Sequence, residues 1–131
     1  MNAPTPGASQ PTILIIENEV SNRLLVERVL STRGYRCLSA ANGREALDLL
    51  DRESVDLILT DLSMPVMDGY RATQHIRARP ELVDVPIVAV TAYALSDESQ
   101  AALRAGCTEY LTKPFKPRQL LDVVERLLHQ S

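Results

Sequence analysis

The chain has 131 residues, of which 45% are hydrophobic and 24% are charged, a composition that suits one globular domain and leaves no room for a second. The formal net charge is -3 and no basic run is present, which argues against direct nucleic-acid binding. No apolar stretch approaches the roughly 20 residues that span a bilayer, and the N-terminus MNAPTPGASQP lacks the features of a signal peptide. We therefore expect a cytoplasmic protein with no membrane or nucleic-acid partner.

Residues 1–11 contain three prolines with Gly, Ala and Ser, which predicts a flexible tail before a domain over 12–131. Within that domain, short apolar runs alternate with amphipathic stretches five times. The runs that predict strands are TILIIE, YRCLSA, VDLILTD, VPIVAVT and TEYLT. The stretches that predict helices are VSNRLLVERVLSTRG, REALDLLDR, GYRATQHIR, LSDESQAALRAG and PRQLLDVVERLLHQ.

Five β-α units predict a parallel sheet covered by helices on both faces. They are too few for a closed eight-stranded barrel, so we predict a flavodoxin-like, doubly wound α/β fold, (βα)5, with a five-stranded parallel sheet in the order 2-1-3-4-5. In this order Cys37 and Cys107 lie too far apart to form a disulfide, and both are expected to be buried structural thiols.

Local signals mark several helix ends. Gly34 and Gly106 each follow a predicted helix, where a left-handed residue is favoured, and Asn42 and Glu45 have the spacing of a capping box. Pro117 suits the first turn of the last helix. That helix places a stripe of apolar side chains toward the sheet, and its members are Leu120, Val124, Leu127 and Leu128.

Polar side chains stand at the ends of four predicted strands. They are Glu17 and Asn18 after the first, Asp61 after the third, Thr91 after the fourth and Lys113 after the fifth. Because the carboxyl ends of parallel strands share one edge of a sheet, these side chains should converge there. Carboxylate and amide oxygens suit Mg²⁺. A carboxylate nucleophile beside a hard cation and a lysine indicates phosphoryl transfer to an aspartate.

The motifs ILIIEN, LILTDLSMPVMDG, VTAYA and YLTKPF occur in this order along the chain. Over residues 12–131 the chain therefore resembles the receiver domains of bacterial response regulators in two-component signalling, in particular stand-alone, chemotaxis-regulator-like receivers. The resemblance implies that Asp61 is the phosphoacceptor, that Lys113 binds the phosphoryl oxygens, and that the Lys113–Pro114 bond is cis. It further implies that Thr91 moves toward the phosphoryl group and that Tyr110 rotates in response. The implied ligands of Mg²⁺ are Glu17, Asn18, Asp61 and the backbone carbonyl of Ser63.

By this resemblance, the phosphohistidine of a sensor histidine kinase or histidine phosphotransfer protein donates its phosphoryl group to Asp61 in a Mg²⁺-dependent reaction. The domain would catalyse only its own phosphorylation and dephosphorylation, and so would not be an enzyme in the usual sense. The signal would leave by contact between a downstream protein effector and the face built from the fourth helix, the fifth strand and the fifth helix.

Asn18 departs from the family pattern, because most receivers have two acids at the end of the first strand. An amide oxygen can still coordinate Mg²⁺ but brings no charge, so we expect weaker metal binding. Glu19 could substitute, although an acid at a helix start is ordinarily solvated. Asn18 also motivates an alternative function, a receiver-like scaffold that binds partners without being phosphorylated. The presence of Asp61, Thr91 and Lys113 argues against that alternative.

Other functions on this fold have less support. A dinucleotide-binding domain needs a glycine-rich first loop, and here that loop is ENEVSN. An Asp-nucleophile phosphatase usually has a second acid two residues after the first, where this chain has Ser63. His75 and His129 fall on helices away from the strand ends, so we expect solvated side chains. Tyr93, two residues past Thr91, is a candidate for slowing hydrolysis of the acyl phosphate.

Overall fold

The computed structural model describes residues 10–62, 69–92 and 97–129. Within these ranges the strands are β1 (Thr12–Ile16), β2 (Arg36–Ala40), β3 (Leu57–Asp61), β4 (Ile87–Thr91) and β5 (Glu109–Thr112). The helices are α1 (Val20–Ser31), α2 (Gly43–Leu50), α3 (Gly69–Arg77), α4 (Asp97–Ala105) and α5 (Pro117–Leu128). A short 3₁₀ helix, η1 (Pro80–Leu82), lies between α3 and β4 and was not expected from the sequence.

The five strands form one sheet in the order β2-β1-β3-β4-β5, and each adjacent pair is parallel. This confirms the predicted fold and strand order. Strands β1 and β3 lie in the interior of the sheet and are almost continuously apolar, because helices cover both of their faces. The register places Ile16 opposite Thr60 and Asp61 opposite Val90, so the polar residues at the strand ends arrive at a common edge.

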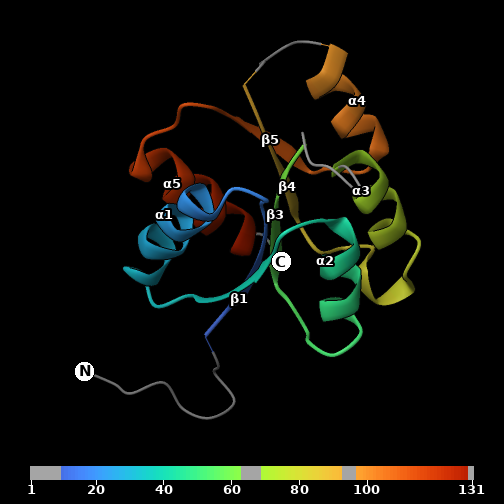
Figure 1. Cartoon of the computed structure of the whole chain (residues 1–131), viewed down its shortest axis with the longest axis horizontal. Helices are drawn as coiled ribbons and strands as arrows, with labels where there is room; N and C mark the ends of the chain where they lie inside the picture. Colours follow the sequence, from blue (N-terminus) through green and yellow to red (C-terminus); the bar gives the residue numbers. More distant parts are fainter. Residues whose placement is uncertain (1–9, 63–68, 93–96, 130–131) are drawn as a thin grey trace.

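Figure 1 shows that α1 and α5 cover one face of the sheet, whereas α2, α3 and α4 cover the other. Each face has its own core. On the α1 and α5 side, Ile13, Leu59 and Val88 from the strands pack in one cluster with Leu120 and Val124 of α5. On the opposite side, strand residues that alternate with these, such as Leu14 and Ile58, pack in a second cluster with helix residues.

The two N-terminal helices on opposite faces differ in how much apolar surface they bury. Helix α2 begins where predicted, because the Glu45 backbone N–H donates to Asn42 Oδ1 at 2.9 Å and the Glu45 carboxylate accepts from the Ala41 N–H at 2.8 Å. Helix α1 leaves Leu24 and Leu25 56% and 59% exposed. A helix that exposes apolar side chains beside a functional edge is a candidate contact surface.

Several other local predictions are confirmed. Pro117 is in the first turn of α5, and the predicted stripe of that helix is buried at Leu120, Val124 and Leu127 and half-buried at Leu128. Cys37 and Cys107 are both free thiols. Cys107 is buried as predicted, but Cys37 is only half-buried, because it stands on the edge strand β2, which has a neighbouring strand on one side only.

Gly34 and Gly106 adopt the left-handed conformation that the sequence predicted, with φ of 79° and 124°. Their surroundings differ. A Cβ atom at Gly34 would meet nothing within 4 Å, whereas one at Gly106 would lie 2.7 Å from Arg77 Cγ. The Arg77 side chain has little freedom to move, because its guanidinium donates to the Gly106 carbonyl at 2.9 Å and to the Leu82 carbonyl at 2.7 Å.

We predict that Gly106→Ala lowers the free energy of unfolding by roughly 2–4 kcal/mol, since it adds a steric clash to a left-handed backbone. The matched variant Gly34→Ala adds only the backbone term and should cost roughly 1–2 kcal/mol. Urea unfolding of both variants measures the difference. Equal losses for the two would show that Arg77 moves aside at no cost.

Candidate functional site

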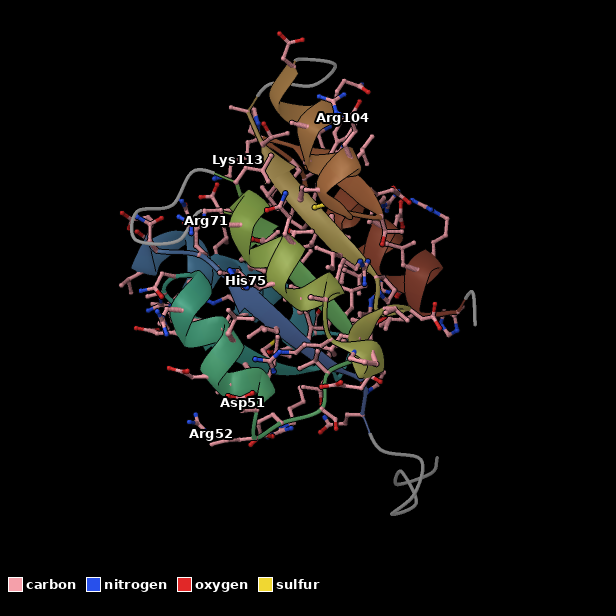
Figure 2. The ribbon with its side chains drawn as sticks, turned by 90° about the vertical axis from the view of Figure 1, so that its right-hand side faces the viewer. Asp51, Arg52, Arg71, His75, Arg104 and Lys113 are labelled. Atoms are coloured by element: carbon pink, nitrogen blue, oxygen red, sulfur yellow. The ribbon has the colours of Figure 1, made fainter. Side chains whose placement is uncertain are left out.

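The carboxyl edge of the sheet brings together the side chains that the sequence singled out. Glu17 follows β1, Asp61 ends β3, Thr91 ends β4 and Lys113 follows β5. The edge is continuous between β4 and β5, because Thr91 pairs with Thr112 in the register and the Lys113 N–H donates to the Thr91 carbonyl at 2.7 Å. Lys113 therefore leaves the sheet at a position fixed by a strand ladder, and Figure 2 shows it at the opposite end of the molecule from Asp51 and Arg52.

Lys113 reaches both acids of the site. Its Nζ lies 3.6 Å from Asp61 Oδ2 and 3.9 Å from Glu17 Oε1. Two carboxylates and one ammonium leave the cluster with a net charge of about -1 at neutral pH. The Lys113–Pro114 bond is cis, as the sequence resemblance implied. The ammonium thus lies where it can bind oxygens carried by either carboxylate.

Glu17 is the most deeply buried acid of this edge, with 7% of its surface exposed. Its Oε2 accepts a hydrogen bond from the Glu19 backbone N–H at 3.0 Å, and its backbone carbonyl accepts one from Arg23 Nη1 at 3.0 Å. Burial raises the pKa of the Glu17 carboxyl; the Glu19 N–H opposes this rise, the Asp61 carboxylate adds to it, and Lys113 opposes it. The ionised form of Glu17 is therefore held in an unfavourable environment.

The two residues after Glu17 differ in their contacts: the side chain of Asn18 is exposed to solvent, whereas that of Glu19 caps a helix. Asn18 is exposed at the edge, next to the acids. Glu19 is the N-cap of α1, and its Oε1 accepts from the Ser21 N–H at 3.2 Å and from Ser21 Oγ at 2.7 Å. These contacts lower the pKa of the Glu19 carboxyl. Glu19 therefore caps the helix, as the ordinary interpretation predicted, and is not oriented as a substitute for an acid at position 18.

The sequence hypothesis is that Thr91 moves toward the phosphoryl group and that Tyr110 rotates in response. The structure gives the starting positions of the two residues. Thr91 is 3% exposed at the end of β4. Tyr110 lies on β5 opposite Ala89 and is half-buried against the core on the α2, α3 and α4 side. The two residues thus stand on adjacent strands, one at the edge and the other further back.

Two predicted positions cannot be placed. The Ser63 carbonyl, implied as a metal ligand, and Tyr93, implied to shield the acyl phosphate, lie outside the described residues. The two histidines are placed and are away from the site. His75 is exposed in the last turn of α3, and His129 is exposed just after α5. Both confirm the expectation of solvated side chains.

Next to the acids lies a cavity of about 470 Å³ that sequence reasoning did not predict. It runs between α1 and the segment after β5, and its walls include Leu25, Val26 and Phe115 beside Glu17 and Asp61. Asn22 also lines it, and its side chain hydrogen-bonds to Glu17 and helps to lower the pKa of that carboxyl. One feature of the sequence could have indicated this cavity. Helix α1 starts three residues after Glu17, so its first turn lies at the same edge of the sheet.

The donor set tests whether this edge suits Mg²⁺. Within the described ranges, no group of three or more His, Cys, Asp or Glu side chains is arranged to hold a metal ion. Mg²⁺ does not require such a group, because it keeps several waters and commonly takes only one or two protein carboxylates. The carboxylates of Glu17 and Asp61 with the amide of Asn18 therefore fit a hydrated Mg²⁺ ion.

Comparison with known proteins agrees with the fold. The model of the response regulator receiver domain matches residues 13–125. The chain belongs to the response regulator receiver domain family. This receiver domain is 38% identical over 118 residues to an uncharacterized 14.6 kDa protein of Leptolyngbya boryana, and the match covers 90% of each chain.

The receiver domain is also similar to parts of sensor kinases. It is 37% identical over 123 residues to the sensor histidine kinase GacS of Pseudomonas protegens, and the match covers 92% of this chain but 13% of the kinase. A solved receiver domain of the sensor histidine kinase PA1611 from Pseudomonas aeruginosa, with a magnesium ion in its active site cleft, is 38% identical, with a TM-score of 0.85 and coverage of 92% and 98%. The receiver domain is thus one of those used in two-component signalling.

No helix in the described part of the chain has the length and apolar character needed to cross a membrane.

The raised pKa of Glu17 predicts how the stability of the fold depends on pH. A carboxyl whose pKa is higher in the folded than in the unfolded state binds protons preferentially when folded, so its ionisation destabilises the fold as pH rises above the unfolded value. In protein treated with EDTA, Glu17→Gln should therefore have a higher Tm than the wild type at pH 7. The gain should vanish below the unfolded pKa, near pH 4. A lower Tm at pH 7 would mean that the ion pair with Lys113 outweighs burial.

Proposed function

We propose that this receiver domain accepts a phosphoryl group from a phosphohistidine onto Asp61 in a Mg²⁺-dependent reaction and signals through protein contacts. The observation that carries the proposal is the position of Lys113 Nζ, 3.6 Å from Asp61 Oδ2 and 3.9 Å from Glu17 Oε1. A lysine between two partly desolvated carboxylates at a sheet edge is the arrangement that phosphoryl transfer to an aspartate requires.

In the proposed reaction an oxygen of the Asp61 carboxylate attacks the phosphorus atom of the donor phosphohistidine. The new bond joins this oxygen to phosphorus while the nitrogen-phosphorus bond breaks, and the electron pair stays on the imidazole nitrogen. Lys113 binds oxygens of the transferred group, and Thr91 stands at the end of the neighbouring strand β4. A bound Mg²⁺, held by Glu17, Asp61 and Asn18, would offset negative charge as the group transfers.

A sensor histidine kinase or a histidine phosphotransfer protein is the proposed donor. Asp61 is only partly exposed, so the donor must insert its side chain into the edge and bind the adjacent surface. Leu24 and Leu25 of α1 supply exposed apolar area there, and Leu25 also lines the cavity beside Asp61. Burying such side chains is favourable for association. The α1 surface thus supports a protein donor.

The proposed output begins with charge. Phosphorylation replaces the single negative charge of the Asp61 carboxylate with about -1.5 to -2 charges on the phosphoryl group. We propose that Thr91 turns toward the new oxygens and that Tyr110, half-buried behind it, rotates inward. The surface of α4, β5 and α5 would then present a different shape to an effector. A partner that binds the phosphorylated shape must prefer it by roughly 5.5 kcal/mol to move the population from 1:99 to 99:1.

A phosphorylation-independent scaffold is the second candidate, and Asn18 is the observation that favours it. With only two carboxylates at the edge, the site has less charge with which to hold Mg²⁺ than the usual family pattern. The location of Lys113 between both carboxylates argues for the phosphoacceptor function, since a scaffold has no need for this cluster of opposite charges.

We predict that incubation with acetyl phosphate and Mg²⁺ adds one phosphoryl group to the wild type and none to Asp61→Ala, because Asp61 supplies the nucleophile. Intact mass spectrometry measures the gain. Asp48→Ala is a matched control, since this aspartate is exposed on α2 and should leave the gain unchanged. If no protein gains mass under any condition, the scaffold function is favoured.

We also predict that Asn18→Asp binds Mg²⁺ more tightly than the wild type, by roughly one order of magnitude, because it adds a third carboxylate to the edge. Isothermal titration calorimetry with MgCl₂ gives both affinities. Glu19→Gln serves as the control: its carboxylate already caps α1, so its loss should leave Mg²⁺ affinity nearly unchanged. Equal affinities for Asn18→Asp and the wild type would contradict the role of residue 18 as a ligand.

A further inference from the structure

A second concave surface lies at the amino-terminal edge of the sheet, opposite the edge that carries Asp61. It encloses about 940 Å³, within the size range of functional clefts. Its walls come from the segments just before the strands, from η1 with the residues that follow it, and from the end of α5. We call it the amino-edge groove, and the residues that matter below are Asp56, Glu81, Val83, Asp84, Val85 and Leu128.

The amino-edge groove has an apolar floor. Leu127 is buried there, and Val85 and Leu128 are half-buried. Val83 is 51% exposed. Among the described residues, the other large apolar side chains with comparable exposure all lie on α1, so Val83 is the only such side chain outside that helix. A ligand that covers this floor would remove Val83 from water, which is favourable.

The rim of the groove is acidic. Asp56, Glu81 and Asp84 line it, and among the residues that the structure describes no lysine or arginine does. The Asp56 carboxylate is held in place, because its Oδ2 accepts from the Thr12 N–H at 2.7 Å. Tyr35 and His129 also line the groove, Arg77 lies near Asp84, and Arg33 and Glu125 lie near Tyr35.

The neighbouring cations do not cancel the acidic rim, because Arg33 is paired with Glu125 and the single arginine Arg77 faces three carboxylates. The half-buried Arg77 guanidinium donates to the carbonyls of Gly106 and Leu82 and to Thr108 Oγ1, which hold it beside the groove. The groove also includes three prolines, Pro11, Pro80 and Pro86, which have no backbone N–H to donate. Acceptor oxygens therefore dominate its polar rim, and a donor of positive charge is the complementary ligand.

We propose that the amino-edge groove binds a basic segment of another protein, in which an arginine or lysine stands beside an apolar side chain. The apolar side chain packs on Val83 and Leu128, and the cation lies among Asp56, Glu81 and Asp84. Acidic segments and nucleic acids are repelled by the same carboxylates. Because the groove and Asp61 lie at opposite edges of the sheet, this partner and a phosphohistidine donor can bind together, and binding is independent of phosphorylation at Asp61.

The test uses the full chain labelled with ¹⁵N and a blocked hexapeptide of alternating leucine and arginine. The expected result is a set of chemical-shift changes at residues 83–85 and at Leu128, with an affinity that weakens as ionic strength rises. A hexapeptide with glutamate in place of arginine should not bind. Shift changes confined to α1 or to the Asp61 edge, or equal binding of the acidic peptide, would overturn the proposal.

Two variants locate the binding energy. Val83→Ser and the double variant Glu81→Gln with Asp84→Asn should each weaken the peptide by roughly tenfold or more. The altered side chains are exposed, so the fold should be retained. Val20→Ser, on a side chain that is 53% exposed on α1, and Asp48→Asn are the matched controls and should bind as the wild type does. Unchanged affinity in both test variants would overturn the proposal.

Asp61→Ala separates this inference from the proposed phosphoryl transfer. The variant should bind the arginine peptide as tightly as the wild type, even though it cannot be phosphorylated. Loss of peptide binding in Asp61→Ala would place the contact at the other edge and overturn the assignment of the groove.

Discussion

Two carboxylates held close together at the edge of a buried sheet repel each other, and the ammonium of Lys113 between them is the interaction on which the site depends. Lys113 reaches both acids only because β5 runs parallel to β4 and the Lys113 N–H is held by the Thr91 carbonyl. Asp61 and Glu17 come from β3 and β1, which are neighbours in the sheet. The strand order therefore sets the electrostatics of the edge, and a change in register would separate the three charges.

The same arrangement predicts that the ionised form of Glu17 costs stability. Glu17 is 7% exposed, and its pKa is raised mainly by burial and further by Asp61, so its ionised form is unfavourable in the fold. The backbone N–H of Glu19 and the ammonium of Lys113 offset part of this cost. A site held in this way is prepared for a cation, since a positive ligand relieves the excess negative charge that the protein maintains there. Asn18 reduces the imbalance by removing one negative charge relative to the common family pattern.

The two edges of the sheet carry different chemistry. At the carboxyl edge, charged groups converge on a small cavity beside α1, and apolar side chains of that helix remain exposed. At the amino edge, turns and the end of α5 enclose a groove with an apolar floor and an acidic rim. Because the rigid sheet separates them, the two surfaces can bind different partners without competition. Under the two proposals, one protein holds the domain at its amino edge while another exchanges a phosphoryl group with it at the carboxyl edge.

The sequence alone determined the alternation of strands and helices, the strand order and the identity of Glu17, Asp61, Thr91 and Lys113, because buried parallel strands have continuous apolar runs and their carboxyl ends share one edge. Helix ends at Gly34, Gly106 and Asn42 were also predictable, since caps depend on local chemistry. Tertiary structure decided what depends on distant segments. The half-exposure of Cys37, the fixed position of Arg77, the cavity under α1 and the amino-edge groove each arise from elements remote in sequence. The local sequence pattern does not predict these features, because they arise when the helices pack on the two faces of the sheet.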